Sequence, residues 1–323
     1  TLRGHRHPAC ARPTYRLPKG PSDLPTPQPR RRPPRPTPPG PRVLIVNTRA
    51  RHGGRQLEIV RRELESRGVR LAAVFPVDAP ERLARVVAEA VRSGARTLIV
   101  GGGDGTFSTV SNALAGSDTI LGALPLGTGN DFARSLGVPF RLGEACAVVA
   151  RGRLAKVDLG RAGERFFINA ASIGVTSEMT VSLRQRPGLK KGLGRLAYPT
   201  VALGKALAKR AFTVGLETGR YHGAGLIIAP EANLRDHVLD LYAILSGHEP
   251  GQLWRDLLVL ARVAKGLRAG RHVADPLVLH MRTRQVRLEA SPGQALDLDG
   301  ELRGRTPVLL ECVPDALRVI LPA

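Results

Sequence analysis

The chain has 323 residues, of which 42% are hydrophobic and only 4% aromatic, and its formal net charge is +22. This length suits two domains of ordinary size or one large one, and the apolar content is sufficient for a substantial core. The scarcity of aromatic side chains argues against stacking platforms for single-stranded nucleic acid. The charge favours anionic partners, which are nucleotide phosphates, an acidic membrane surface or nucleic acid.

The cysteine spacing and the hydropathy exclude further classes of protein. Cys10, Cys146 and Cys312 are far apart and form no CxxC spacing, so they predict neither a zinc site nor a disulfide framework. No run of about 18 apolar residues occurs, so the sequence predicts no membrane-spanning helix. We therefore expect a cytoplasmic protein.

Residues 1–41 are predicted to form a disordered tail. The segment PTPQPRRRPPRPTPPGP has proline at nearly every second or third position. Proline lacks a backbone donor and fixes φ, so neither a helix nor a sheet ladder can run through this segment. A polybasic tether to anionic lipid is the functional alternative for the tail.

Residues 42–151 are predicted to form an α/β domain. Apolar runs and helical periodicities alternate in chain order: strand 42–47, helix 55–68, strand 69–75, helix 80–94, strand 96–100, helix 106–114 and strand 119–126. Strands that alternate with helices predict a parallel sheet with helices on both faces.

The pattern changes after about Arg151. Residues 152–323 hold short apolar runs separated by glycine and proline, which predict a mostly antiparallel β domain. Two helical insertions are expected, near 189–210 and 251–269. The closing strand, within 310–323, could return to the first domain.

The stretch VGGGDGTFSTVSNAL, residues 100–114, places glycines between an apolar strand and a helix. Ligands of doubly wound sheets bind at the carboxyl ends of strands, and we place residues 101–105 there, with the helix starting near Thr106. Backbone without Cβ atoms, followed by a helix N-terminus, suits phosphate. The structural alternative is a tight turn with Asp104 as a helix cap.

A second loop follows the next strand. LPLGTGNDFARSLGVP, residues 124–139, again places glycines at a strand end before a helix. Asn130 and Asp131 could be simple caps, and Asp131 with Arg134 an ordinary i,i+3 pair. Two glycine loops on neighbouring strands nevertheless predict the walls of one phosphate-binding crevice.

A third element, ALDLDGELRG, lies near the end of the chain and carries Asp297, Asp299 and Glu301. In a strand, residues i and i+2 point the same way, so Asp299 and Glu301 would share a face. Paired carboxylates favour a cation between them, and Mg²⁺ fits a phosphate site. An Asp-Gly hairpin turn is the alternative.

The set GGGDGT, PLGTGNDFARSLGVP and LDLDGE resembles the diacylglycerol kinase catalytic family, in its bacterial lipid kinase branch. The similarity covers about Pro41 to Pro322, and the GTGNDFAR loop is its most specific part. The resemblance implies a Rossmann-like N-terminal α/β domain and a C-terminal mostly antiparallel β-sandwich domain that close over a cleft. It also implies an ATP-dependent kinase that phosphorylates a lipid hydroxyl, of diacylglycerol or a related lipid.

The resemblance further implies roles for individual residues. Asp299 would be the catalytic base, and Asp104 with Glu301 would hold a catalytic Mg²⁺. A second, structural Mg²⁺ would lie on Asp236, with the backbone carbonyls of Asn233 and Val238. The residues implied to bind ATP are Asn47, Gly101, Gly102, Gly103, Asp104, Gly105, Thr106, Phe107, Gly127, Thr128, Gly129 and Asn130.

The sequence departs from the family pattern at three places. Asn47 is kept, but the proline that usually follows it is absent and the second strand ends in FPVD without a hydroxyl residue, so ATP affinity is in question. His237 replaces the glycine that usually follows Asp236, which puts the structural Mg²⁺ in question and makes His237 either a metal ligand or an exposed histidine. About twenty residues are missing near Thr218, which we expect to expose a sheet edge and weaken the second domain.

The segments 251–272 and 188–210 mix apolar residues with lysine and arginine, so they are either basic amphipathic helices on an anionic membrane surface or ordinary domain helices. We expect peripheral membrane association and a lipid substrate as partner. Rival hypotheses are a lipid-binding pseudokinase, an NAD-kinase-like enzyme and, resting on charge alone, a nucleic-acid binder.

Overall fold

The computed structural model of the chain describes residues 40–49, 53–174, 213–222, 225–244, 266, 270–274 and 278–323. The predicted tail, except residues 40 and 41, lies outside this part of the chain. The two predicted helical insertions also lie outside it, except for residue 266.

The first large element is an eight-stranded sheet, with β13 (Gln285–Leu288) pairing β16 beside its main path, in the strand order β2-β1-β3-β4-β16-β5-β6. Strands β1 to β4 are parallel, β16 runs parallel to β4, and β5 runs antiparallel to β16. The chain's last strand therefore returns to the N-terminal sheet. The strands are β1 (Arg42–Asn47), β2 (Ala73–Val77), β3 (Thr97–Gly102), β4 (Ile120–Pro125), β5 (Arg153–Ala162), β6 (Arg165–Phe167) and β16 (Val308–Leu321).

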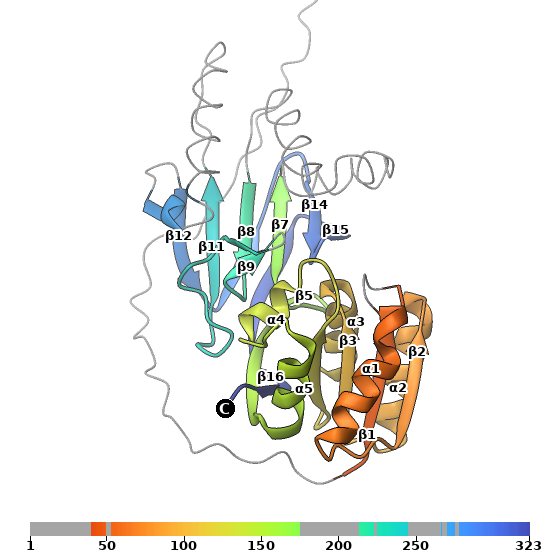
Figure 1. Cartoon of the computed structure of the whole chain (residues 1–323). Coiled ribbons are helices and arrows are strands. Elements are labelled where there is room, and N and C mark those ends of the chain that lie inside the picture. The colour runs from red at the N-terminus through yellow and green to blue at the C-terminus, as the bar shows by residue number, and fades with distance from the viewer. Residues whose placement is uncertain are drawn as a thin grey trace, which may run out of the picture.

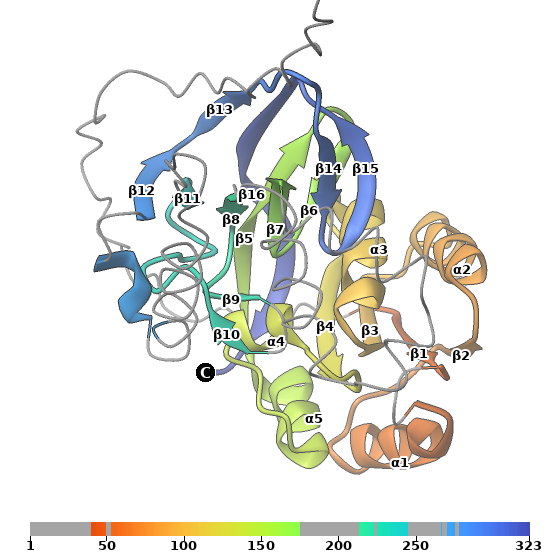
Figure 2. The same ribbon diagram turned by 90° about the horizontal axis from the view of Figure 1, so that it is seen from above.

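Helices cover both faces of the parallel part of this sheet. Figure 2 shows α1 and α5 on one side and α2 and α3 on the other. Strands β3 and β4 are buried along their whole length, as continuous apolar runs require when both faces are covered. The helices are α1 (Gly53–Ser66), α2 (Pro80–Arg92), α3 (Asp104–Leu114), α4 (Asp131–Ser135) and α5 (Leu142–Arg151).

Two boundaries differ from the sequence expectation. Strand β2 begins at Ala73 instead of Val69 and continues through Pro76, which is tolerated because β2 is the edge strand of the sheet. Strand β3 continues through Gly101 and Gly102, and α3 begins at Asp104, two residues before the predicted start. Only Gly103 separates the strand from the helix.

The second large element is a six-stranded antiparallel sheet in the order β12-β11-β8-β7-β14-β15 (Figure 1). A separate core lies between this sheet and the antiparallel end of the first one, and it includes Leu216, Leu241, Phe167 and Leu310. The arrangement is sandwich-like, as the family resemblance implied. The strands are β7 (Ala170–Gly174), β8 (Thr213–Glu217), β11 (Leu239–Ile244), β12 (Val278–Thr283), β14 (Ala295–Leu298) and β15 (Glu301–Arg305).

The predicted exposed edge near Thr218 is not present at β8. This strand pairs with β7 on one side and with β11 on the other, so it lies inside the sheet. After Glu217 the chain turns directly into β9 (Tyr221–His222), which pairs with β10 (Leu226–Ile227). β8 is therefore not an edge strand, because β11 supplies its second hydrogen-bonding partner.

Candidate active site

The two glycine loops touch each other. The N–H groups of Leu126 and Gly127 both donate to the carbonyl of Gly102, at 2.8 and 3.1 Å. A Cβ on Gly127 would lie 2.5 Å from the Cα of Gly103. The two backbones therefore approach so closely that any side chain at Gly127 would clash. The two loops therefore lie side by side, as the sequence predicted, and phosphate binding between them stays a prediction.

Asn130 fixes the second loop and does not cap α4. Its side-chain oxygen accepts the N–H of Gly127 and its amide nitrogen donates to the carbonyl of Gly127, both at 2.9 Å. The residue has φ 56 and is buried, and it makes no side-chain bond to the helix. Asp131, the next residue, instead accepts the N–H of Gly225 at 2.7 Å.

The glycines of the first loop serve different ends. A Cβ on Gly101 would meet Leu126 at 2.7 Å, and one on Gly102 would meet Thr106 at 2.5 Å, so these two permit close packing within the protein. A Cβ on Gly105 would meet nothing within 4 Å. Of the glycines in this loop, Gly105, in the first turn of α3, is therefore the one whose missing side chain leaves open space beside the backbone.

Three further residues predicted to bind ATP can be placed. Asn47, at the end of β1, donates from Nδ2 to the Thr106 hydroxyl at 2.9 Å, so β1 and α3 are joined at the crevice. Thr128 is exposed at the second loop. The side chain of Phe107 is buried and packs against Phe132 at 6.0 Å between ring centroids, so it belongs to the core.

Asp104 opens α3 and is bound from two sides. Its Oδ1 accepts the N–H of Phe132 at 3.0 Å and lies 3.5 Å from the side-chain nitrogen of Asn169. Asn169 lies between β6 and β7, at the start of the second sheet. The carboxylate of the glycine loop is therefore in contact with the other half of the molecule.

Asp299 is held by four donors. Its Oδ1 accepts the N–H groups of Asn169 and Ala170, at 2.9 and 3.1 Å. Its Oδ2 accepts the N–H of Ile168 at 3.0 Å and the hydroxyl of Ser108, on α3, at 2.8 Å. Asn169 thus contacts both Asp104 and Asp299, and it joins the two carboxylates that the sequence places 195 positions apart.

The prediction that Asp299 and Glu301 share a strand face is wrong. Asp299 and Gly300 have φ angles of 51 and 84, and Leu298 pairs with Glu301, so Asp299 and Gly300 form the two-residue turn between β14 and β15. Turns with positive φ at both positions favour Asp-Gly and reverse the chain. The Asp299 side chain points to residues 168–170, whereas Glu301 is half exposed and forms an ion pair with Arg303.

The environment of Asp299 also affects its proton affinity. Burial raises the pKa of this carboxyl above its usual range, while the hydrogen bonds from Ile168, Asn169, Ser108 and Ala170 lower it. Burial has the larger effect. A carboxylate with a raised pKa is a stronger base near neutral pH.

Sequence reasoning named Asp104 but missed Ser108 and Asn112, the other residues of α3 that attach it to the second half of the chain. Asp104, Ser108 and Asn112 follow at intervals of four and lie on one helix face. Asn112 exchanges two hydrogen bonds with the backbone of Phe166, at 2.8 and 2.9 Å. The spacing D-x₃-S-x₃-N was the signal that could have identified this face.

Glu217 was also missed. It is 3% exposed, and its Oε2 has no hydrogen-bond partner among the described residues. Its register partner in β7 is Ala170, which binds Asp299. Burial is the largest of the effects that raise the pKa of Glu217 to about 8; His222 opposes the rise, and the carboxylates of Asp299 and Asp131 add to it.

The residues around Asp104 fit a magnesium ion. The amide oxygen of Asn169 is buried without a hydrogen-bond partner in the described part of the chain, and it belongs to the side chain that contacts Asp104. Mg²⁺ accepts one or two protein oxygens together with phosphate and water. No group of three or more His, Cys, Asp or Glu residues within the described residues could hold a metal alone.

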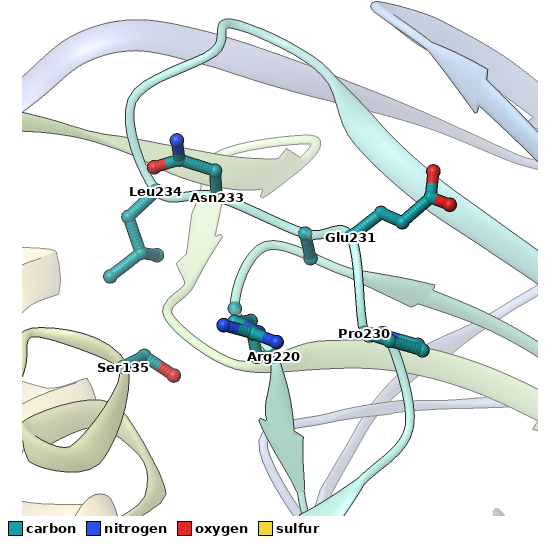
Figure 3. Close-up of a pocket in the computed structure, with 8 residues that line it drawn as sticks. Ser135, Arg220, Pro230, Glu231, Asn233 and Leu234 are labelled. Carbon is teal, nitrogen blue, oxygen red and sulfur yellow. The ribbon is translucent and has the colours of Figure 1, made fainter. Parts of the chain in front are cut away.

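A pocket of about 330 Å³ lies between the end of α4 and the segments 219–220 and 230–234 (Figure 3). Its wall at Gly219 follows Thr218, whose hydroxyl donates to the carbonyl of Ile168 at 2.7 Å. Figure 3 shows Arg220 between Ser135 and Pro230, and the carboxylate of Glu231 points away from Arg220. The pocket is lined by Ser135, Gly219, Arg220, Pro230, Glu231, Ala232, Asn233 and Leu234.

Within the described residues, no helix combines the length and the apolar character needed to cross a bilayer. The segments considered for contact with a membrane surface lie almost wholly outside the described part of the chain. Peripheral association therefore stays a prediction.

Comparisons with known proteins identify the family of the chain. The chain matches the diacylglycerol kinase catalytic domain over residues 41–162 and the YegS C-terminal NAD kinase beta sandwich-like domain over residues 192–321. A protein named probable lipid kinase YegS-like from Pseudomonas putida is 32% identical, over 74% of this chain and 81% of that protein. One with the same name from Pseudomonas fluorescens is 35% identical, over 74% and 81%.

Solved structures share the fold. A diacylglycerol kinase from Bacillus anthracis is 22% identical and has a TM-score of 0.64, covering 87% of this chain and 96% of that chain. A further structure from that organism is 23% identical with a TM-score of 0.71, covering 87% and 95%. With both domain models matched and relatives above 30% identity, the chain belongs to the diacylglycerol kinase catalytic domain family, among the YegS-like lipid kinases.

Proposed function

We propose that the chain is an ATP- and Mg²⁺-dependent lipid kinase that transfers the γ-phosphate of ATP to the hydroxyl of diacylglycerol or a related lipid. One observation carries the proposal: Asn169 contacts both Asp104, at the glycine loops, and Asp299, on the opposite hairpin. Phosphoryl transfer needs alignment and charge neutralisation more than covalent chemistry. The glycine loops would align the phosphates, and Asp299, which Asn169 links to Asp104, would lie close enough to act on the lipid hydroxyl.

The nucleotide phosphates would lie over Gly105, where the backbone faces open space and the N-terminus of α3 favours anions. Asp104 and the amide oxygen of Asn169 would hold the Mg²⁺. When bound, the ion neutralises charge on the phosphate oxygens. Asn47 positions α3 through its bond to Thr106, and Thr128 is exposed at the crevice for contact with the nucleotide.

Asp299 would accept the proton of the lipid hydroxyl. Each of its two oxygens already accepts two hydrogen bonds. Three of the four donors are backbone N–H groups, which are held in place by the fold. The fourth donor, the Ser108 hydroxyl, can rotate away. The lipid hydroxyl would therefore take the place of Ser108 at Oδ2, where the raised pKa of Asp299 suits general base catalysis.

The acceptor would be reached at the surface of a membrane. The net charge of +22 favours anionic bilayers, so we propose a cytoplasmic protein that associates peripherally with them. Binding to vesicles should fall as the salt concentration rises, because the attraction is screened. Binding that is independent of both salt and anionic lipid would contradict this part of the proposal.

The test is transfer of labelled γ-phosphate from ATP to mixed-lipid vesicles with Mg²⁺, comparing the unchanged chain with Asp299→Asn. We expect a labelled lipid from the unchanged chain, and a loss of about 10²-fold or more in the variant. Equilibrium binding of ATP to both proteins is the control. A chain that binds ATP and folds but yields no labelled lipid would be a pseudokinase, and the proposal would fail.

A further inference from the structure

The segment from Asn233 to Val238 carries the residues that the family resemblance assigns to a structural Mg²⁺. In this structure, two of their ligand groups bind other protein groups instead. The carboxylate of Asp236 forms an ion pair with the guanidinium of Arg282, on β12. The carbonyl of Asn233 accepts the N–H of Arg235 at 2.7 Å. Two of the three assigned ligands are therefore engaged by other residues.

Arg282 faces two carboxylates at once. It is the register partner of Asp240 in β11, and its Nε lies 3.8 Å from Asp240 Oδ1. Asp240 is 1% exposed, and it also binds His280 at 2.8 Å. Arginine stays protonated at any relevant pH, so a divalent ion at Asp236 would meet a fixed positive charge. These residues do not fit a metal ion.

The turn itself is also held by protein groups. His237 has φ 64, a conformation that favours glycine. Its N–H and its ring Nδ1 both bind the carboxylate of Asp158, at 2.7 and 3.0 Å. Asp158, on β5, donates its own N–H to the carbonyl of Leu234 at 2.7 Å. The first sheet thus fixes a turn that glycine and a metal would otherwise have to form.

We infer that the guanidinium of Arg282 is the resident cation of this turn, and that residues 233–238 are held in place without a divalent ion. One arginine neutralises Asp236 and faces Asp240, which links the turn to β12 and β11. This inference concerns folding and is independent of the proposed kinase activity.

The first experiment measures thermal unfolding of the full chain by circular dichroism, without nucleotide, in EDTA and in millimolar Mg²⁺. We expect Mg²⁺ to give no rise in Tm that depends on Asp236. The variants Asp236→Asn and Asp104→Asn separate the two candidate sites. A Tm rise in Mg²⁺ that is lost in Asp236→Asn but kept in Asp104→Asn would overturn the inference.

The second experiment removes the arginine. Arg282→Met keeps the apolar stem without the charge, and we expect its Tm in EDTA to fall by about 3 to 8 °C because Asp236 and Asp240 lose their cation. Arg282→Lys should retain part of this stability. Adding Asp236→Asn to Arg282→Met should recover part of the loss, since the unpaired carboxylate is gone. An Arg282→Met variant with the same Tm as the unchanged chain would contradict the inference. If this variant does not fold, the first experiment, which compares the Tm in EDTA and in Mg²⁺, still tests the inference.

Discussion

The substitution Gly105→Ala separates ligand binding from folding at the glycine loop. Its Cβ would meet no protein atom within 4 Å, and Gly105 lies in the first turn of α3. Alanine is favoured over glycine in a helix by about 0.5–1 kcal/mol. At roughly 2–4 °C per kcal/mol for a domain of this size, the Tm should stay equal or rise by about 1–4 °C.

The same Cβ would occupy the space that we assign to the ATP phosphates. Misplacing a reacting group by about 1 Å can cost on the order of 10²-fold in rate, so we expect kcat/KM for ATP to fall by about 10- to 100-fold. Stability and activity should thus move in opposite directions.

The assay combines thermal unfolding with steady-state kinetics at varied ATP. Gly143→Ala is the matched control, because Gly143 lies in the first turn of α5 and its Cβ would meet only the ends of the flexible side chains of Glu63 and Arg67. We expect the control to leave kcat/KM for ATP unchanged. A Gly105→Ala variant with unchanged ATP kinetics would refute the placement of the phosphates.

Three further predictions follow from the same contacts. Gly127→Ala should lower activity and should destabilise the fold by about 1–3 kcal/mol, which lowers the Tm, because its Cβ would lie 2.5 Å from the Cα of Gly103; an unaffected Tm would show that the loops can separate freely. Ser108→Ala should keep kcat within a few-fold, since the lipid hydroxyl replaces Ser108; a loss as large as that of Asp299→Asn would contradict this. The raised pKa of Glu217, about 8 against 4.5 when unfolded, means that the folded state keeps a proton that the unfolded state releases. Stability should therefore fall between about pH 5 and pH 8, by up to about 1.4 kcal/mol per pH unit, and denaturant unfolding should show a weaker fall in Glu217→Gln; equal slopes would contradict the shift.

Local sequence signals predicted the parallel part of the fold well. Continuous apolar runs predicted β3 and β4, which are buried along their whole length, and the glycines after them predicted the two loops that meet. Strand ends of a parallel sheet meet at one edge, so the meeting of Gly103 and Gly127 followed from topology. Boundaries moved where glycine could continue a strand, as at Gly101 and Gly102.

The contacts between the two halves could not be predicted from local patterns. Asp299 and Glu301 were placed on one face because period-two reasoning assumes a strand, whereas positive φ at Asp299 makes a turn. The contacts of Asn169 with Asp104 and Asp299 depend on how α3 docks on β6, and no short-range spacing specifies that docking. Arg282 was not considered at Asp236 because the pairing of β11 with β12 brings them together across 46 residues.

The measurement that tests the central claim most directly offers two acceptors at once. The chain is incubated with γ-labelled ATP, Mg²⁺, mixed-lipid vesicles and NAD, and the label in each product is separated by chromatography. The account predicts label in a lipid, none in NAD, and loss of the labelled lipid in Asp299→Asn. Label in NAD, or label in lipid that persists undiminished in Asp299→Asn, would contradict it.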